Sequence, residues 1–302
     1  MATDAVLLVA YGGPRRPDEI RPFLEHVTRG RRIPPGRLEE VARHYELLGG
    51  RSPLNELTFR QAEGLRQALG RTPVYVGMRA WEPFVAGTLA QMALDGVRRA
   101  VCIILAPHAC DASRERYLEA IDEGRAGLGP RAPAISYVRS WYAHPLFVET
   151  WADTVAAALE AIETSRRREA TLLFTAHSIP LPSAEASAYV QEVHTSARAV
   201  SERLGHTGWQ VAWQSRSGNP RDPWLEPDVN LALRALAASG TREVVLAPIG
   251  FVCDHVEVLY DLDVEAQQTA GGLGLTVARA STPNDHPLFV RMLAEVARQH
   301  LG

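Results

Sequence analysis

Cysteine is scarce in this chain of 302 residues, which has only Cys102, Cys110 and Cys253. An odd number of scattered thiols argues against a disulfide framework and against a cysteine-ligated iron–sulfur cluster. This composition is typical of a protein in a reducing compartment, so we expect a cytoplasmic location.

A basic leader and a long apolar run are also missing. The chain starts "MATDAVLLVAYGG", and none of its apolar stretches approaches the roughly 20 residues that span a bilayer. The net charge of -3 offers no attraction to nucleic acid or to an anionic membrane. We therefore expect no nucleic-acid partner, at most peripheral membrane association, and a monomer.

The common nucleotide and hydrolase motifs are absent as well. The sequence contains no Walker loop, no G-x-G-x-x-G fingerprint and no nucleophile elbow. NTPase, dinucleotide-dependent and hydrolase functions therefore have no motif to support them.

Short apolar runs alternate with helical stretches along the whole chain. The runs include "AVLLVA", "AVCIILAP", "TLLFTA" and "VVLAPI", and they are apolar at successive positions. Strands that are apolar on both faces predict an α/β fold with parallel sheets covered by helices.

The two halves of the chain also resemble each other. "AVLLVAYGGP" is similar to "ATLLFTAHSIP", "RRAVCIILAPH" to "TREVVLAPIG", and "HPLFVETWADTV" to "HPLFVRMLAEVA", in the same order. These matches predict two similar halves, residues 1–143 and 144–302. The first half is longer, and we assign its extra residues to a basic insertion at about 26–53, either a lip over an anionic ligand or a solvated loop.

Candidate chemical groups follow the predicted strands, where ligands bind in open parallel sheets. His177 ends the run "TLLFTAH", and "GFVCDHVEVLYDLDVE" carries a row of acids after another strand of the same half. Read as a helix starting near Asp254, this row places Glu257, Asp261 and Glu265 on one face. Imidazole and carboxylate together bind a divalent metal or transfer protons, whereas a structural histidine and a solvated acidic face are the alternatives.

Several of these stretches together resemble the ferrochelatases, the enzymes that insert ferrous iron into a porphyrin. They are "YGGP", "GGRSPL", "SWYAHPLFV", "TAHSIP", "WQSRSGNPRDPWLEPDV" and "GFVCDHVEVLYDLDVE". The likeness covers nearly the whole chain and is closest to the cluster-free type that metallates coproporphyrin III. It implies two similar Rossmann-like halves, each a four-stranded parallel sheet flanked by helices, with the active-site cleft between them.

The resemblance also implies the function and the bound species. It predicts a metal–porphyrin lyase of haem biosynthesis whose partners are porphyrin and ferrous iron, with Fe²⁺ as a substrate and no permanently bound cofactor or iron–sulfur cluster. Protoporphyrin IX as the porphyrin, cobalt insertion into sirohydrochlorin, and a non-catalytic tetrapyrrole carrier are the alternatives. The cobalt enzymes use more than one histidine at the metal, and His108 or His255 would have to supply the second.

Carried over residue by residue, the resemblance gives His177 and Glu257 the catalytic and iron-binding roles. Asp261 and Glu265 match carboxylates of an outer metal site, where Mg²⁺ is an option, or of a proton exit. The substrate-binding candidates are Tyr11, Arg29, Arg31, Ser52, Tyr117 and Trp224. Trp224 lies in a proline-rich loop and could instead simply pack it. Thr28, where relatives carry a basic residue, and Trp81, where they carry a histidine, depart from the family pattern near the porphyrin propionates.

Overall fold

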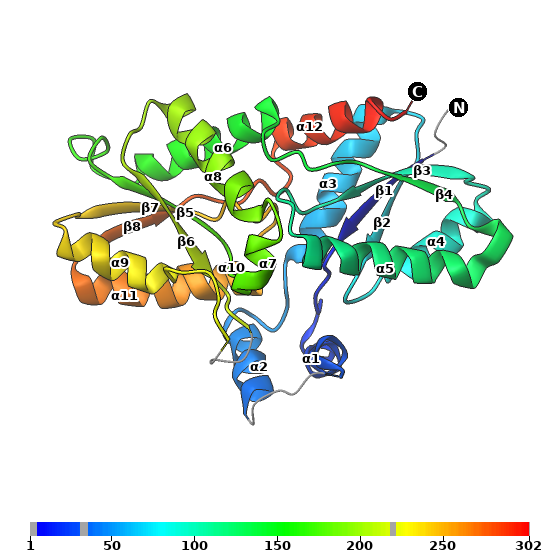
Figure 1. Ribbon diagram of the computed structural model, residues 1–302, viewed down its shortest axis with the longest axis horizontal. Helices are drawn as coiled ribbons and strands as arrows, with labels where there is room; N and C mark the ends of the chain where they lie inside the picture. The colour runs from blue at the N-terminus through cyan, green and yellow to red at the C-terminus, as the bar shows by residue number, and fades with distance from the viewer. Residues whose placement is uncertain (1–4, 31–35, 218–221, 302) are drawn as a thin grey trace. The chain divides into compact units, whose positions relative to one another are not determined.

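The chain forms two compact units in a computed structural model that describes residues 5–30, 36–217 and 222–301 (Figure 1). Unit 1 comprises residues 1–105, 113–139 and 290–302, and unit 2 comprises residues 106–112 and 140–289. The division of the sequence at residues 143 and 144 remains a prediction from the repeat.

Unit 1 is built on a four-stranded parallel sheet with the order β2-β1-β3-β4. Its strands are β1 (Ala5–Ala10), β2 (Val74–Met78), β3 (Arg99–Ile104) and β4 (Ala134–Tyr137). All six residues of β1 are buried, as expected for a central strand covered on both faces. The helices of this unit are η1 (Pro17–Glu19), α1 (Ile20–Thr28), α2 (Arg37–Leu47), α3 (Leu54–Leu69), α4 (Val85–Leu94), α5 (Asp111–Leu128), η2 (Gly129–Arg131) and most of α12 (Pro287–Arg298).

Helices cover both faces of this sheet. Helices α3 and α12 lie on one face and α4 and α5 on the other (Figure 1). A side chain at Gly124 of α5 would place its Cβ only 2.9 Å from the Ala86 Cα of α4, so glycine is what lets these two helices pack so closely.

Unit 2 repeats this topology, with the strand order β6-β5-β7-β8 and all pairs parallel. Its strands are β5 (Thr171–His177), β6 (Trp209–Gln214), β7 (Glu243–Ala247) and β8 (Thr276–Arg279). Its helices are α6 (Pro145–Glu160), α7 (Leu181–Glu185), α8 (Tyr189–Leu204), α9 (Val229–Ala238), α10 (Val256–Val258), the π-helix η3 (Leu259–Glu265) and α11 (Ala266–Leu273). The prediction of two four-stranded parallel sheets flanked by helices is therefore confirmed.

One core of unit 2 lies between the sheet and the helices that contain and follow the acidic stretch. Val258 of α10, Leu262 of η3 and Ala266 of α11 are fully buried there against Leu173 and Leu246 of the sheet. Helices α6 and α8 lie on the other face (Figure 1). Apolar residues between the acids thus anchor the acidic helix to the sheet.

The repeated "HPLFV" stretch is a helix start in both places. His144 precedes α6 and its Nδ1 accepts a hydrogen bond from the Leu146 N–H at 3.2 Å. His286 precedes α12 and accepts from the Leu288 N–H in the same way, at 3.3 Å. Proline follows each histidine at the first helical position, where it needs no hydrogen-bond donor. The similarity therefore reflects a shared capping geometry.

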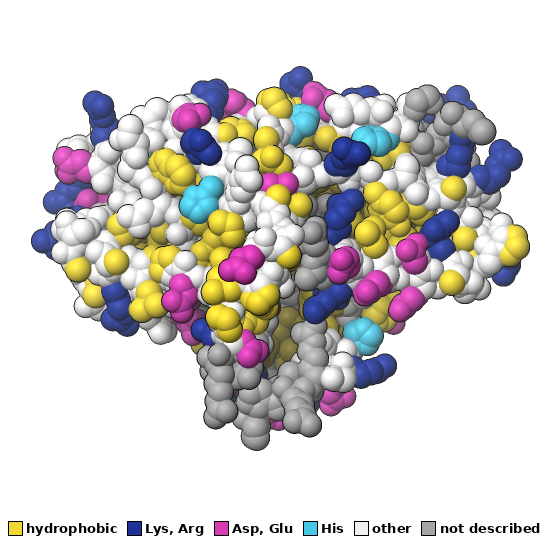
Figure 2. Space-filling view, in the orientation of Figure 1, with side chains coloured by type: hydrophobic (Ala, Val, Ile, Leu, Met, Phe, Trp, Pro, Cys, Tyr) yellow, Lys and Arg dark blue, Asp and Glu magenta, His cyan; other side chains and the backbone are white. Residues whose placement is uncertain are grey.

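Charge is mixed over the face shown in Figure 2, where acidic and basic side chains are interspersed. Within the described ranges, no helix is both long enough and apolar enough to cross a membrane.

We expect His286→Ala to lower the free energy of unfolding by about 1 kcal/mol, because the Leu288 N–H loses its cap acceptor. His286→Asn retains a good cap acceptor and should stay near the unsubstituted protein. Urea unfolding at pH 7 measures both. Equal midpoints for the alanine variant and the parent chain would show that this cap contributes nothing.

Candidate active site

His177 is the last residue of the central strand β5, at the carboxyl edge of the unit 2 sheet. The loop after β7 lies directly against this strand end, and the Gly250 N–H donates to the Thr175 carbonyl oxygen at 3.1 Å. A Cβ at Gly250 would lie 2.6 Å from the Ala176 Cβ. Only glycine therefore allows the chain that leads to Glu257 to pass this close to His177.

The orientation of the His177 ring is set by the backbone. Its Nδ1 is hydrogen-bonded to the Ser178 carbonyl oxygen, which can only accept. Nδ1 therefore carries the proton in the neutral ring, and the Nε2 lone pair is left available. Tyr189 holds the same residue through a hydrogen bond from its hydroxyl to the His177 carbonyl oxygen, at 2.9 Å.

Glu257 faces this nitrogen from helix α10. Its Oε2 lies 4.0 Å from the His177 Nε2, and the two side chains are 55% and 32% exposed, so a ligand can reach both. Glu257, Asp261 and Glu265 follow one another at intervals of four residues on the continuous helix formed by α10, η3 and α11. The π-helical stretch is notable because π turns are rare and frequently mark functional sites.

Asp254 does not belong to this row. The helix begins at Val256, later than the acidic pattern predicts, and Asp254 instead pairs with Arg279 at 3.0 Å. The sequence gives no sign of this pairing because Arg279 follows 25 residues later, at the end of β8.

Asp261 accepts hydrogen bonds from the last residue of strand β6 and from the residue that follows it. Gln214 donates from Nε2 to Asp261 Oδ2 at 3.2 Å, and the Ser215 hydroxyl donates to the same oxygen. Burial raises the pKa of Asp261 to about 7, against the opposing effect of the Ser215 hydrogen bond. The buried Thr175 hydroxyl donates to Gln214 Oε1 and so fixes which way the amide points. Gln214 and Ser215 were not among our site candidates, although they lie in the "WQS" stretch.

Tyr11 and Tyr117 lie on either side of one arginine in unit 1. The Arg79 guanidinium lies 4.7 Å from the Tyr11 ring centre and 5.2 Å from that of Tyr117. Tyr11 is 38% exposed, whereas Tyr117 is buried, and burial raises the pKa of its hydroxyl. Of these two substrate-binding candidates, Tyr11 presents the more accessible ring.

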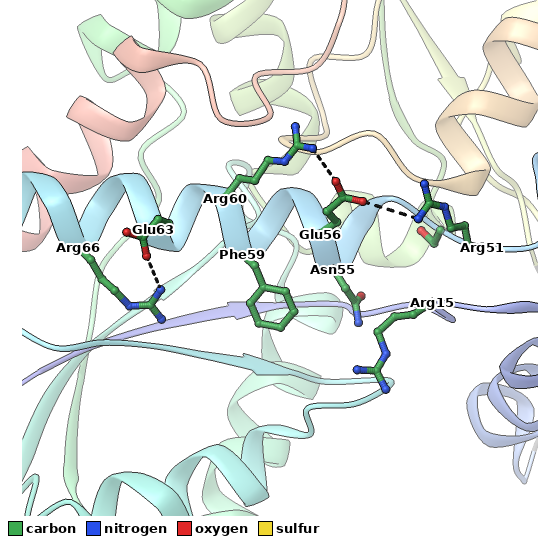
Figure 3. A pocket seen from close by; sticks show the side chains of 9 residues that line it. Arg15, Arg51, Asn55, Glu56, Phe59, Arg60, Glu63 and Arg66 are labelled. Atoms are coloured by element: carbon green, nitrogen blue, oxygen red, sulfur yellow. Dashed lines mark hydrogen bonds and ion pairs between the residues drawn. The ribbon is translucent and has the colours of Figure 1, made fainter.

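Ser52 lies beside the exit of β1, where its N–H donates to the Pro14 carbonyl oxygen at 2.8 Å. It lines a groove of about 530 Å³ along α3, the size of a small-molecule pocket. Figure 3 shows that Arg51, Arg60 and Arg66 of this groove are paired with glutamates, as Arg60 is with Glu56 at 2.6 Å. Arg29 is exposed at the end of α1, and Arg31 lies outside the described residues.

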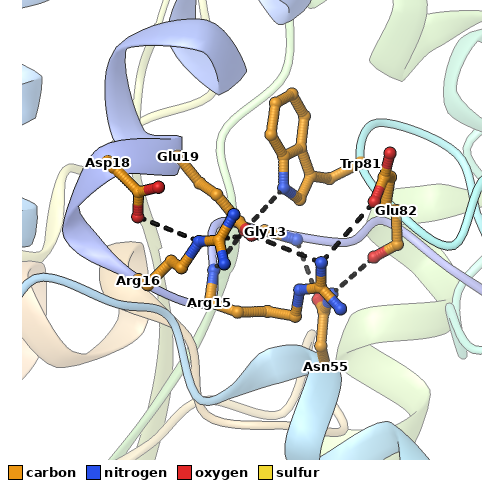
Figure 4. Close-up of polar contacts among 8 residues, drawn as sticks. All are labelled: Gly13, Arg15, Arg16, Asp18, Glu19, Asn55, Trp81 and Glu82. Atoms are coloured by element: carbon orange, nitrogen blue, oxygen red, sulfur yellow. Dashed lines mark hydrogen bonds and ion pairs between the residues drawn. The ribbon is translucent and has the colours of Figure 1, made fainter.

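Trp81, one of the two departures from the family pattern, has a structural partner (Figure 4). Its indole N–H donates to the buried Glu19 carboxylate at 2.8 Å, which also accepts from Arg15. Burial would raise the pKa of Glu19, but the hydrogen bonds from Arg15 and Trp81 outweigh it and lower this pKa. Thr28 is the other residue that departs from the family pattern, and its hydroxyl donates to the Leu24 carbonyl oxygen one turn earlier in α1.

Trp224 is tied to the residues that follow His177. It forms an antiparallel bridge with Pro180, and the next residue, Leu225, accepts a hydrogen bond from the Ser178 hydroxyl at 2.9 Å. The Trp224 indole Nε1 is buried and has no hydrogen-bond partner among the described residues. The loop is therefore anchored next to the candidate site.

His108 and His255, the candidates for a second metal-binding histidine, differ from His177 in their surroundings. His108 is buried with its Nε2 3.0 Å from the Ser196 hydroxyl, and burial lowers its pKa to about 3. The His255 ring packs on Phe251, and desolvation lowers its pKa in spite of Glu257 and Asp254. Over the described parts of the chain, no group of three or more His, Cys, Asp and Glu side chains is arranged to hold a metal ion.

The ferrochelatase family model matches residues 3–301. The chain belongs to the ferrochelatase family. It is 44% identical to the coproporphyrin III ferrochelatase of Nocardia farcinica, with 100% of this chain and 89% of the relative covered. It is likewise 44% identical to the protein of that name from Mycolicibacterium smegmatis, with 100% and 91% covered.

Two solved structures share the fold at low sequence identity. SirB from Bacillus subtilis, solved with Fe³⁺, matches with a TM-score of 0.62 at 12% identity over 99% of this chain and 95% of its own. DR2241 from Deinococcus radiodurans, a multi-domain protein similar to chelatases, matches with a TM-score of 0.57 at 16% identity. The match covers 98% of this chain and 55% of DR2241. The topology is therefore that of the chelatases.

We expect His108 to make the fold sensitive to mild acid. Because its pKa is lowered to about 3 in the folded state, only the unfolded chain takes up this proton as the pH falls below about 6.5. His108→Gln should therefore lose about 1–2 kcal/mol less stability than the parent between pH 7 and pH 5. Urea unfolding at both pH values checks this, and identical losses would contradict it.

We expect Gly250→Ala to destabilise the protein by about 1–3 kcal/mol, because the added methyl overlaps Ala176. Gly271→Ala in α11 is the matched control, since a Cβ there meets no atom within 4 Å. It should be neutral or slightly stabilising. Thermal unfolding of the two variants compares them, and equal melting temperatures would contradict the close approach.

Proposed function

We propose that this chain inserts ferrous iron into coproporphyrin III to give coproheme, in haem biosynthesis. Support comes from the family match over residues 3–301 and from relatives at 44% identity that are named for this substrate. The observation that carries the chemistry is the available Nε2 of His177, 4.0 Å from the Glu257 carboxylate. An imidazole and a carboxylate that face each other in this way can bind a divalent metal or pass a proton, and metal insertion requires both.

The reaction exchanges two pyrrole N–H protons for one Fe²⁺ without a change in oxidation state. His177 accepts a proton or the incoming iron at Nε2, because its Nδ1 is committed to the Ser178 carbonyl oxygen. Glu257 supplies a carboxylate, which either binds the iron or takes a proton from His177. Binding energy from the rest of the macrocycle bends the ring so that the pyrrole lone pairs become accessible.

Asp261 and Glu265 extend the carboxylate series along the same helix. In this proposal they guide metal towards Glu257 or carry protons away from it. Carboxylate oxygens are also the ligands that Mg²⁺ prefers, so an outer Mg²⁺ site at these two residues remains part of the proposal. The proposed porphyrin contacts are Tyr11, Arg29, Arg31, Ser52, Tyr117 and Trp224.

We expect His177→Ala to reduce metallation by about 100-fold or more, because the acceptor for protons or iron is lost. Porphyrin affinity should change little, since the imidazole is only one of many contacts with the macrocycle. Anaerobic turnover with ferrous iron measures the first effect, and quenching of porphyrin fluorescence measures the second.

His194→Ala is the matched control, because this histidine of α8 packs against Trp209 of β6 and its loss should not affect turnover. Glu257→Gln keeps the side-chain shape and removes the charge, and it should also lose most of the activity. Ordinary turnover by the His177 variant would refute the catalytic assignment.

The substrate itself is tested by comparing coproporphyrin III, protoporphyrin IX and sirohydrochlorin under the same anaerobic conditions. The proposal predicts the highest kcat/KM for coproporphyrin III with Fe²⁺. A preference for protoporphyrin IX would change the substrate assignment, and a preference for cobalt with sirohydrochlorin would change the enzyme class. Tight binding of all three without turnover would indicate a carrier.

A further inference from the structure

Arg279 occupies an unusual place relative to the helix that carries Glu257. It is the last residue of β8, and its side chain is only 14% exposed. Its Nη1 donates to Asp254 at 3.0 Å and its Nε donates to Asp263 at 2.6 Å. Asp254 precedes Glu257 and Asp263 follows Asp261, so one guanidinium holds both ends of the segment that carries Glu257 and Asp261.

Asn284 strengthens the first of these two attachments. Its N–H donates to the Val252 carbonyl oxygen, its Oδ1 accepts from the Asp254 N–H at 3.0 Å, and its Nδ2 donates to the Asp254 carboxylate at 3.3 Å. The loop before Glu257 is thus fixed by backbone and side-chain hydrogen bonds. Arg279 adds the only cation that an ion pair gives Asp254 or Asp263 in the described residues.

Arg279 also divides the acids of this stretch into two groups. It neutralises Asp254 and Asp263, and none of the described ion pairs joins Glu257 or Asp261 to an arginine. Without the guanidinium, two further uncompensated carboxylates would stand on the segment that carries Glu257, where like charges repel one another. A lysine cannot replace this function fully, because its single ammonium lacks the fork that reaches two acids in different directions.

We propose that Arg279 is a positioning residue that holds Glu257 opposite His177 and is needed for metal insertion but not for porphyrin binding. This role rests on the proposed ferrochelatase activity. Arg279 acts through Asp254 and Asp263, its Nη1 also donates to the Ala280 carbonyl oxygen at 3.2 Å, and it places Glu257 without touching the reacting atoms. A displacement of about 1 Å in such a group lowers turnover by up to about 100-fold.

The test compares Arg279→Gln and Arg279→Lys with the parent chain. We expect the glutamine variant to lose about 10-fold or more in kcat, with porphyrin affinity by fluorescence within about twofold, and the lysine variant to lose less. Arg203→Gln is the matched control, because Arg203 makes a similar two-contact pair with Glu149 on exposed surface. It should retain full turnover. Unchanged kcat for Arg279→Gln would overturn the proposal.

A triple variant, R279M/D254N/D263N, keeps the test decisive if Arg279→Gln folds poorly. It removes the guanidinium together with the charges that it neutralises, so stability should recover whereas turnover stays low. Turnover at the parent level would show that Arg279 serves only as a counter-ion, and would overturn the positioning role.

Amide hydrogen exchange separates this inference from the proposed function. Arg279→Gln should speed exchange over residues 255–265 and leave strands β5 and β7 unchanged, whether or not the protein turns over porphyrin. Parent-like exchange over 255–265 would overturn the positioning role. An inactive parent chain with faster exchange in the variant would refute the function and retain the structural role.

Discussion

The hydrogen bond between the His177 ring and the Ser178 carbonyl oxygen determines what this site can do. It places the proton on Nδ1 and leaves Nε2 as the nitrogen of the His177 ring that can bind metal or accept a proton. Everything around it serves this orientation: β5 ends at His177, Tyr189 holds its carbonyl oxygen, and Ser178 is itself anchored to the Trp224 loop. A histidine on a freely rotating loop would offer either nitrogen and would favour neither.

The carboxylates are controlled by a different means. Glu257 stands on a helix whose other side is locked into the core by Val258 and Leu262, so its distance from the sheet is fixed by apolar packing. Its position along the helix axis is then fixed by Arg279 and Asn284, which hold Asp254 in the loop before the helix. Packing and ion pairing thus control separate directions of movement, and within one acidic stretch Asp254 and Asp263 pair with Arg279 whereas Glu257 faces His177.

Much of the fold could be predicted from the sequence, because apolar runs and their repetition depend on local pattern. Two parallel sheets followed from strands such as "AVLLVA" and "TLLFTA". His177 and Glu257 could be placed near each other because both follow strands of one sheet. The Asp254–Arg279 pair could not, since it joins residues that are brought together only by β8. Nor could the π-helix or the tautomer of His177, because both depend on backbone hydrogen bonds with no side-chain signature.

The backbone at Asn284 limits how this region can evolve. Its φ of 46° lies in the left-handed region, where glycine, asparagine and aspartate are best tolerated. Glycine would lose both side-chain hydrogen bonds to Asp254, and aspartate would offer no donor to the Asp254 carboxylate. Asparagine combines the backbone conformation with a donor and an acceptor at the right length. A substitution at this position would therefore change where Glu257 lies, although Asn284 itself makes no contact with iron or porphyrin in the proposed chemistry.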